Sequence, residues 1–153
     1  MPTTSDTLTV LHDNAQMFAK NFYNLTGAHM GIHDMLYNIS IPSGLSGNNL
    51  CAVCKKYCCE FVERCQCDDK KYLEKAAMTK QTTVFRCHLG ATSVIIPVVE
   101  DDVTVGVIDF GMIFVQPDAT LTFEAIFANL MKEYPEVFTK KHREELQEAY
   151  NST

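Results

Sequence analysis

The chain has 153 residues, of which 46% are hydrophobic, and its formal net charge at pH 7 is −6. This length suits one globular domain that buries its own core, and the acidic balance argues against direct binding to nucleic acid. The N-terminal residues contain no basic stretch followed by an apolar run, and no apolar run approaches membrane-spanning length. We therefore expect a single cytoplasmic domain over residues 1–153 that binds neither nucleic acid nor a membrane.

The first predicted element is a helix over residues 7–25. Its apolar residues recur at three- and four-residue spacing, which is typical of a helix with one packed face: Leu8, Leu11, Ala15, Phe18, Phe22 and Leu25. Gly27 marks its end. Two short runs with strand character follow, over residues 28–33 and 35–41, and residues 42–49 have the composition of a turn or loop.

Six of the seven cysteines lie between Cys51 and Cys67, in a segment without glycine or proline. We predict a helix over residues 50–65 and a second over residues 68–78, which could also be one broken helix. Helical spacing gives four of the thiols a common face, namely Cys51, Cys54, Cys58 and Cys65.

Three strands are predicted next, over residues 82–87, 93–99 and 103–115. A short connection at residues 100–102 joins the last two strands, so they should form an antiparallel hairpin. Asp109 is the one charged residue of the third strand, and it alternates in phase with Val107 and Ile113. Its carboxylate is either a buried polar anchor or a sign that this side of the strand faces solvent.

The chain closes with two predicted helices, over residues 123–134 and 139–150. Phe123, Phe127 and Tyr134 belong to a wide apolar face of the first, which either covers the sheet or contacts a second copy of the chain. The whole order of elements predicts an α+β fold, with one antiparallel sheet and helices packed on it. Such layers leave a natural pocket between them.

Cysteines at this density are consistent with disulfides, with a metal or redox centre, or with the lining of an apolar cavity. The odd number of cysteines and the missing leader argue against disulfides. Zinc or an iron–sulfur cluster needs three or four thiolates that converge, and one straight helix cannot bring them together. That alternative requires a break near Cys58 or an additional ligand from Cys87 or His88. Its candidate ligands are Cys51, Cys54, Cys58, Cys65 and Cys87.

Cys87 and His88 suggest a thiol–imidazole pair at first sight. Neighbouring residues of a strand point to opposite faces, however, so these two cannot form a hydrogen-bonded dyad with each other. The sequence also lacks a phosphate-binding glycine motif. We therefore expect that the protein is not an enzyme.

Several short motifs follow the order and spacing of one family. They are Leu25-Thr26-Gly27-Ala28, Leu50-Cys51, Cys65-Gln66-Cys67-Asp68, Phe85-Arg86-Cys87-His88-Leu89-Gly90, Ile96-Pro97-Val98 and Val105-Gly106-Val107-Ile108 through Gly111. In these motifs the chain resembles the PocR sensory domain family, which are small-molecule-sensing domains with a PAS-like fold attached to transcription regulators and histidine kinases. Two positions depart from the family's pattern: Ala91 stands in place of the usual Leu, and Met112 in place of the usual Gln.

The resemblance implies a PAS-like core over about residues 8–115, followed by C-terminal helices over residues 120–150. It implies that the domain binds a small metabolite, such as a short diol or alcohol, and relays the signal to a kinase or regulator module. The residues expected to line or brace the pocket are Cys51, Cys65, Cys87 and His88, with Asp109 as a polar anchor.

Two further expectations accompany this hypothesis. No cofactor is expected, although the competing hypothesis is a cysteine-based metal, iron–sulfur or redox sensor that holds zinc or an iron–sulfur cluster. We also expect a homodimer whose contact is formed by the N-terminal helix or by the C-terminal helices, since sensory domains pass signals by helix shifts at such interfaces. The departures at Ala91 and Met112 remove or move groups expected to face the pocket, which leaves open a ligand other than the diols associated with the family.

Overall fold

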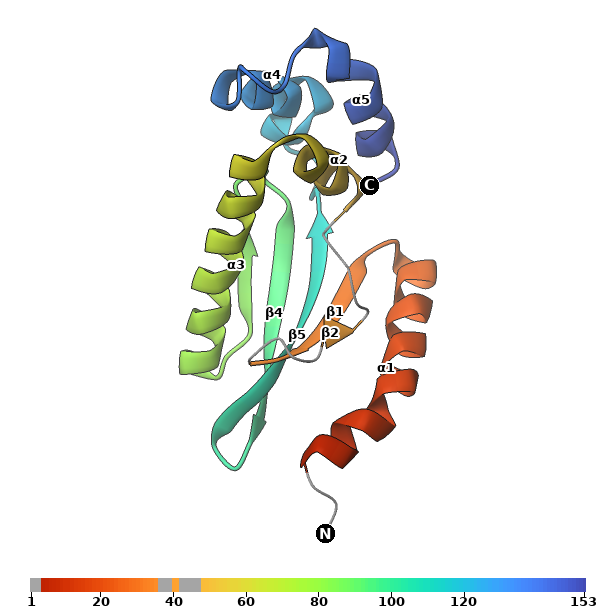
Figure 1. The fold of residues 1–153 in the computed structure, drawn as a ribbon, viewed down its shortest axis with the longest axis vertical. Helices are drawn as coiled ribbons and strands as arrows, with labels where there is room; N and C mark the ends of the chain where they lie inside the picture. The colour runs from red at the N-terminus through yellow and green to blue at the C-terminus, as the bar shows by residue number, and fades with distance from the viewer. Residues whose placement is uncertain (1–3, 36–39, 42–47) are drawn as a thin grey trace.

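The computed structural model describes residues 4–35, 40–41 and 48–153 of the chain (Figure 1). Its helices are α1 (Thr4–Thr26), α2 (Asn49–Tyr57), α3 (Cys59–Thr79), α4 (Phe123–Glu133) and α5 (Arg143–Asn151), with short 3-10 helices η1 (Ala119–Leu121) and η2 (Lys140–His142). Its strands are β1 (His29–Asp34), β2 (Ser40–Ile41), β3 (Thr83–Arg86), β4 (Thr92–Glu100) and β5 (Val103–Ile113). Residues 42–47 of the loop predicted over residues 42–49, and residues 36–39 of the second strand-like run, lie outside the described part.

Within the described residues, the five strands form one sheet in the order β2-β1-β5-β4-β3, and all neighbours are antiparallel. Strands β1 and β5, which lie far apart in the sequence, are therefore adjacent in the middle of the sheet. The hairpin predicted for β4 and β5 is confirmed, and Asp101 and Asp102 at its tip both have positive φ angles, as type I′ hairpin turns require. The predicted α+β fold, a PAS-like antiparallel sheet with helices packed on it, is confirmed.

Helix α3 covers one face of this sheet, which we call the inner face. The register pairs Ile95 with Asp109 and Pro97 with Val107, and paired residues of antiparallel strands project to the same side. Leu73 and Ala76 of α3 pack there in one cluster with the buried residues Phe85, Ile95 and Val107. The carboxylate of Asp109 therefore projects from the inner face, on the side that α3 covers.

The alternation of β5 ends before Ile113. Gly111 and Met112 both have positive φ angles, and the register with β4 shifts by one residue between Ser93 and Thr92. Such a bulge reverses the side to which the following residues point. The prediction that Asp109 is in phase with Val107 holds, whereas the prediction that Ile113 shares that phase is wrong.

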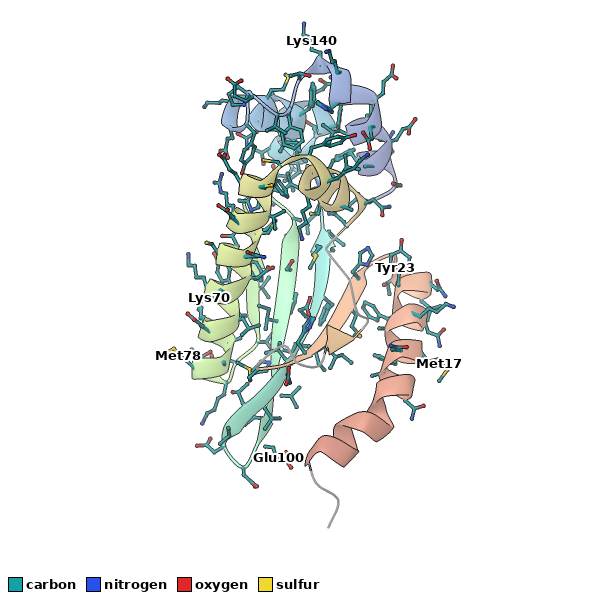
Figure 2. The ribbon with its side chains drawn as sticks, viewed as in Figure 1. Met17, Tyr23, Lys70, Met78, Glu100 and Lys140 are labelled. Carbon is teal, nitrogen blue, oxygen red and sulfur yellow. The ribbon has the colours of Figure 1, made fainter. Side chains whose placement is uncertain are left out.

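Helix α1 packs on the opposite face of the sheet, beside β1. Its contact is made by small and aromatic residues: Ala19 is buried, and the ring of Phe22 meets the ring of Phe110 edge to face at a centroid distance of 6.0 Å. Phe18 and Leu25, which the predicted stripe included, are 58% and 86% exposed. That part of the prediction is wrong, because the close approach of α1 to β1 uses the narrow surface around Ala19. Met17 also projects away from the sheet (Figure 2).

The second core lies beyond one end of the sheet, where α2, α4 and α5 gather (Figure 1). Its fully buried members include Leu50, Phe61, Phe138 and Leu146. The end of α5 returns to the start of α2: the side chain of Asn49 donates to the carbonyl oxygen of Ser152, and the backbone N–H of Leu50 donates to the Thr153 hydroxyl. Residues about a hundred positions apart thus close this core.

The apolar face of α4 is buried inside this second core. Phe123, Phe127 and Tyr134 are each less than a tenth exposed and pack among α2 and α5. The expectation that these residues offer apolar surface to a second copy is therefore wrong. Both C-terminal helices are amphipathic, and they satisfy their apolar faces within the chain.

The cysteine-bearing segment breaks at Cys58. This residue has extended backbone angles, φ −133° and ψ 108°, and separates α2 from a continuous α3. The predicted boundary between residues 65 and 68 is wrong, since Cys65 and Asp68 belong to the same helix. The break is located where the metal hypothesis required one, and it turns the two helices so that thiols from both can approach the sheet.

Candidate functional site

Three of the predicted site thiols come together between the helices and the end of β3. Cys51 is contributed by α2, Cys65 by α3, and Cys87 by the loop that follows β3. Burial, together with smaller contributions from the nearby thiols of Cys87 and Cys65, raises the pKa of the Cys51 thiol to about 12. Burial also raises the pKa of Cys65 to about 11. These thiols are therefore protonated at neutral pH and present a largely apolar surface.

His88 is held next to these thiols by a carboxylate. Asp68 Oδ2 accepts a hydrogen bond from the His88 backbone N–H at 2.9 Å, and it lies 3.2 Å from His88 Nδ1. The other ring nitrogen, Nε2, lies 4.0 Å from Cys65 Sγ. The side chain of His88 is only 5% exposed, and its ring meets Phe61 edge to face. Burial lowers the pKa of His88 despite the opposing effect of Asp68, so the ring is neutral at pH 7.

Cys87 has different surroundings from the other two thiols. Burial raises its pKa, while hydrogen bonds from the backbone N–H groups of Leu89, Ala91 and Gly90 partly oppose that rise. The tight loop that supplies them is closed by the Gly90 N–H donating to the Cys87 carbonyl oxygen at 2.8 Å. Gly90 has φ 92°, and a Cβ there would lie 2.6 Å from a methyl carbon of Leu121, so this loop requires glycine.

The remaining candidate metal ligands lie deeper in the second core. Cys54 and Cys58 are buried in the cluster that α4 and α5 complete, and burial raises the pKa of Cys54. In the part of the chain that the structure describes, no three His, Cys, Asp or Glu side chains are arranged to hold one metal ion. Because metals bind thiolates, the metal hypothesis would require both deprotonation and a local rearrangement, and it stays a prediction.

Asp109 has a partner that the sequence did not indicate. Its Oδ1 lies 2.7 Å from Nε2 of His33 on the neighbouring strand β1. The register places Gly31 opposite Asp109, and a Cβ on Gly31 would lie 2.5 Å from Asp109 Oδ1 and 2.6 Å from His33 Nε2. The missing side chain at Gly31 therefore makes room for a polar pair on the inner face. Sequence analysis paired His33 with no residue of β5, because only the strand order brings them together.

One charged residue of α3 is close enough to interact with this pair. Asp69 of α3 has its pKa raised, first by burial and then by the carboxylates of Asp109 and Asp68, while Lys55 and His33 act in the opposite direction. The Asp69 side chain nevertheless keeps contact with solvent. Asp69 and Lys55 were not predicted as site residues, because on a helical wheel they resemble ordinary surface charges.

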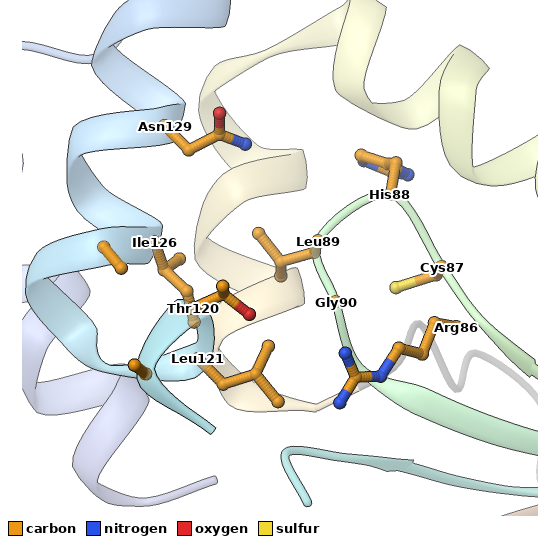
Figure 3. Close-up of a pocket in the computed structure, with 11 residues that line it drawn as sticks. Arg86, Cys87, His88, Leu89, Gly90, Thr120, Leu121, Ile126 and Asn129 are labelled. Carbon is orange, nitrogen blue, oxygen red and sulfur yellow. The ribbon is translucent and has the colours of Figure 1, made fainter.

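A separate hollow of about 570 Å³ lies between the β3–β4 loop and the C-terminal helices (Figure 3). One wall is formed by Arg86 at the end of β3 and by the loop residues Cys87, His88, Leu89 and Gly90, and the opposite wall includes Thr120, Leu121, Ile126 and Asn129. Of the five predicted ligand-binding residues, Cys87 and His88 line this hollow, whereas Cys51, Cys65 and Asp109 do not. Residues of this loop thus lie close both to Cys51 and Cys65 and to the C-terminal helices.

The family model described as the sensory domain found in PocR matches residues 10–153 of this chain. The chain belongs to the PocR sensory domain family. Comparisons with curated proteins and with solved structures gave no match. The match to PocR continues through α4 and α5, so the second core lies inside the region that the family model describes. Within the described residues, no helix combines the length and the hydropathy needed to cross a membrane.

The two departures from the usual PocR pattern occupy structural positions. Ala91 is fully buried, and its carbonyl oxygen accepts a hydrogen bond from the Cys87 backbone N–H. Met112 lies at the bulge of β5, and its carbonyl oxygen accepts a hydrogen bond from the Asn48 side chain. The idea that these residues change the ligand stays a prediction.

Proposed function

We propose that this PocR domain binds a small, neutral organic molecule, such as a short alcohol or diol, between the inner face and the helices α2 and α3. The observation that carries the proposal is the His33–Asp109 pair, which places a hydrogen-bonding group on the sheet face where Phe85, Ile95 and Val107 are buried. A ligand hydroxyl can donate to the carboxylate, while the protonated thiols of α2 and α3 would accept the ligand's hydrocarbon part. Such a combination of apolar walls and few polar groups is typical of small-molecule sites.

The proposal predicts a preference for neutral ligands. The thiols of Cys51 and Cys65 are uncharged at pH 7, as argued from their raised pKa values, and Asp109 supplies an acceptor for a hydroxyl. An anionic ligand would bring its charge close to Asp109 and Asp69, which costs free energy where solvent screens poorly. We expect alcohols and diols to bind better than the matching carboxylates.

Isothermal titration calorimetry tests this directly. The panel consists of ethylene glycol, propylene glycol, ethanol and propionate, each added to the wild-type chain and to the variant Asp109→Asn. Binding of at least one neutral compound that weakens in the variant supports the proposal. If none of the neutral compounds binds, or if the binding is unchanged in Asp109→Asn, the proposed site is wrong.

Relay of the signal is proposed to pass through the β3–β4 loop. Cys87 lies near Cys51, and His88 lies near Cys65, while Leu89 and Gly90 lie against the C-terminal helices. A ligand that moves this loop changes the packing of α4, and a neighbouring kinase or regulator module would read that change. This proposal needs no catalytic step, and it assigns the domain to the cytoplasm, where thiols stay reduced.

The predicted homodimer now depends on α1, since the face of α4 is buried. Among the described side chains of α1, Met17, Phe18 and Leu25 are exposed apolar residues. Light scattering of the wild-type chain and of Phe18→Glu tests the contact. A monomer in both samples at all concentrations would remove the dimer from the mechanism.

The second candidate function is a metal, iron–sulfur or redox sensor. The observation that favours it is the convergence of Cys51, Cys65 and Cys87, which come from three separate elements. The raised pKa values of these thiols argue against it, because thiolates are the form that binds metal. Elemental analysis and a visible spectrum of anaerobically purified protein decide between the two functions: stoichiometric zinc, or a cluster chromophore, would favour the second.

A further inference from the structure

Cys65, His88 and Asp68 stand in a row. Asp68 Oδ2 is 3.2 Å from His88 Nδ1, and His88 Nε2 is 4.0 Å from Cys65 Sγ. A carboxylate accepts hydrogen bonds, so Nδ1 carries the ring proton and Nε2 presents its lone pair towards the thiol. The row therefore has the order of a nucleophile, a base and a residue that orients the base.

The imidazole is fixed from three sides. The backbone N–H of His88 donates to the same Asp68 oxygen as its ring does, and the ring rests against Phe61 with a centroid distance of 4.5 Å. Cys65 and Asp68 are three residues apart on α3, a spacing that gives them a common helix face. One turn of α3 therefore supplies the thiol and the orienting carboxylate, and the loop after β3 supplies the base. This arrangement escaped sequence analysis, which considered only the adjacent Cys87 as a partner of His88.

The chemistry of this row suits a reversible electrophile. The Cys65 thiol is protonated at rest, so it reacts only where a base removes its proton during attack. The neighbouring thiols are uncharged, which favours a small neutral molecule over an ion. A sensor must also release its ligand, and the addition of a thiol to an aldehyde is reversible, whereas alkylation is not.

We propose that Cys65 captures a small aldehyde as a hemithioacetal, with His88 carrying the proton and Asp68 positioning the ring. This inference rests on the proposed function, because it names a ligand class for the same site. The Cys65 sulfur forms a bond with the carbonyl carbon, and the S–H proton passes to His88 Nε2. The electron pair of the C=O π bond moves to oxygen, which then takes the proton from the imidazolium. The net change is addition of S–H across C=O, with no oxidant and no leaving group.

The first experiment follows the adduct in the unmodified chain. Acetaldehyde enriched with the heavy carbon isotope at its carbonyl is added, and carbon NMR is recorded. We expect a protein-bound tetrahedral carbon, distinct from the free aldehyde and its hydrate, that disappears in Cys65→Ser and persists in the matched control Cys59→Ser, which removes an exposed thiol. An adduct that survives in Cys65→Ser, or no adduct at all, overturns the proposal.

A parallel titration separates this proposal from the proposed function. Ethanol has the same carbon chain as acetaldehyde and lacks the electrophilic carbon. If the alcohols bind by calorimetry and acetaldehyde forms no adduct at Cys65, covalent capture is wrong while the small-molecule site stands. If acetaldehyde adds to Cys65 and no alcohol binds, capture stands and the non-covalent proposal for the His33–Asp109 pair fails.

The second experiment tests the roles of His88 and Asp68 through the alkylation rate of Cys65 by iodoacetamide, measured by peptide mass spectrometry. Loss of a general base typically costs on the order of a hundredfold in rate, so His88→Ala should slow alkylation by about that factor and added imidazole should restore part of it. Asp68→Asn should slow the reaction about tenfold and change the tautomer of His88 in nitrogen NMR of the ring. If imidazole gives no rescue and Asp68→Asn leaves both rate and tautomer unchanged, the relay is wrong.

Discussion

Nε2 of His33 and Oδ1 of Asp109 lie 2.7 Å apart on neighbouring strands. The pair occupies the space that a side chain on Gly31 would fill, on the face of the sheet that α3 covers. Burying a polar pair costs desolvation free energy, which only interactions with other polar groups can compensate. Its place on the inner face makes it the most informative target for mutation.

We predict that Gly31→Ala weakens ligand binding more than it weakens the fold. The added methyl group would overlap the ends of both polar side chains, which can swing aside, and overpacking of this kind typically costs about 1–3 kcal/mol. The measurement combines urea unfolding with calorimetric titration of the diol panel. Unchanged affinity for a ligand that binds the wild type would show that the pair does not contact it.

Asn48 connects a helix with a strand, and its two ends can be tested separately. Its Oδ1 accepts from the Cys51 backbone N–H at 2.8 Å and caps α2, while its Nδ2 donates to the Met112 carbonyl oxygen at 2.8 Å. We predict that Asn48→Ala lowers the free energy of unfolding by about 2–4 kcal/mol, because it removes a cap and a buried hydrogen bond. Asn48→Asp keeps the oxygen that caps α2 and loses the N–H donor. The difference in the free energy of unfolding between Asn48→Asp and Asn48→Ala therefore separates the two contributions. Equal stability of all three proteins in urea would contradict this account.

We predict that stability falls on the alkaline side. The thiols of Cys51 and Cys65 have an ordinary pKa of 9.0, which burial raises to about 12 and about 11 in the fold. Above pH 9 the unfolded chain releases these protons and the folded chain does not, so the free energy of unfolding decreases between about pH 9 and pH 12. Urea unfolding at a series of pH values measures the slope. Cys51→Ser should flatten it, while the exposed Cys59→Ser should leave it unchanged.

The acidic side has a separate predicted contribution from His88. Burial lowers the pKa of His88 in the fold below its ordinary value of 6.5. As the pH falls below 6.5, the unfolded chain takes up a proton that the folded chain resists, so the free energy of unfolding decreases. The comparison of His88→Gln with the wild type between pH 7 and pH 5 isolates this contribution. Parallel curves for the two proteins would show that His88 titrates normally.

We predict an order of reaction among the thiols. Cys59 and Cys67 are exposed, whereas Cys51, Cys54 and Cys58 are buried. With iodoacetamide at neutral pH the first two should be modified within the first phase, and the buried three only after the protein unfolds. Peptide mass spectrometry over time, with and without urea, gives the order. Early modification of Cys54 would show that the second core opens readily.

The spacing of the apolar residues along the sequence was sufficient to predict most of the helices and strands. It located the hairpin of β4 and β5 and the two C-terminal helices, because long periodic segments carry strong signals. It did not predict the end of α2 at Cys58, because no glycine or proline marks the extended backbone there. It also predicted that Phe18 and Leu25 of α1 are packed, because they continue the apolar pattern although they are exposed. A pattern of residue types does not say which neighbour an apolar side chain meets.

The site was less accessible to sequence reasoning. The grouping of Cys51, Cys65 and Cys87 followed from motifs, and the structure brings these three together. The partner of Asp109 depends on β1 lying beside β5, and the partner of Cys65 depends on how the loop after β3 folds back on α3. Both are relations between distant segments, which strand order and loop geometry determine and which local patterns do not contain.

The closure of the second core by Ser152 and Thr153 has a consequence for biosynthesis. Leu50 and Cys54 leave the ribosome roughly a hundred residues before the segment that completes their core. Chains grow at about 5–20 residues per second, so α2 waits several seconds with its apolar side uncovered. During that interval the thiols of α2 are accessible to oxidants, and its apolar residues are accessible to chaperones. In the folded domain these thiols and Leu50 are buried. Ribosome-bound chains that lack residues 119–153 should therefore bind chaperones more strongly than chains that contain these residues.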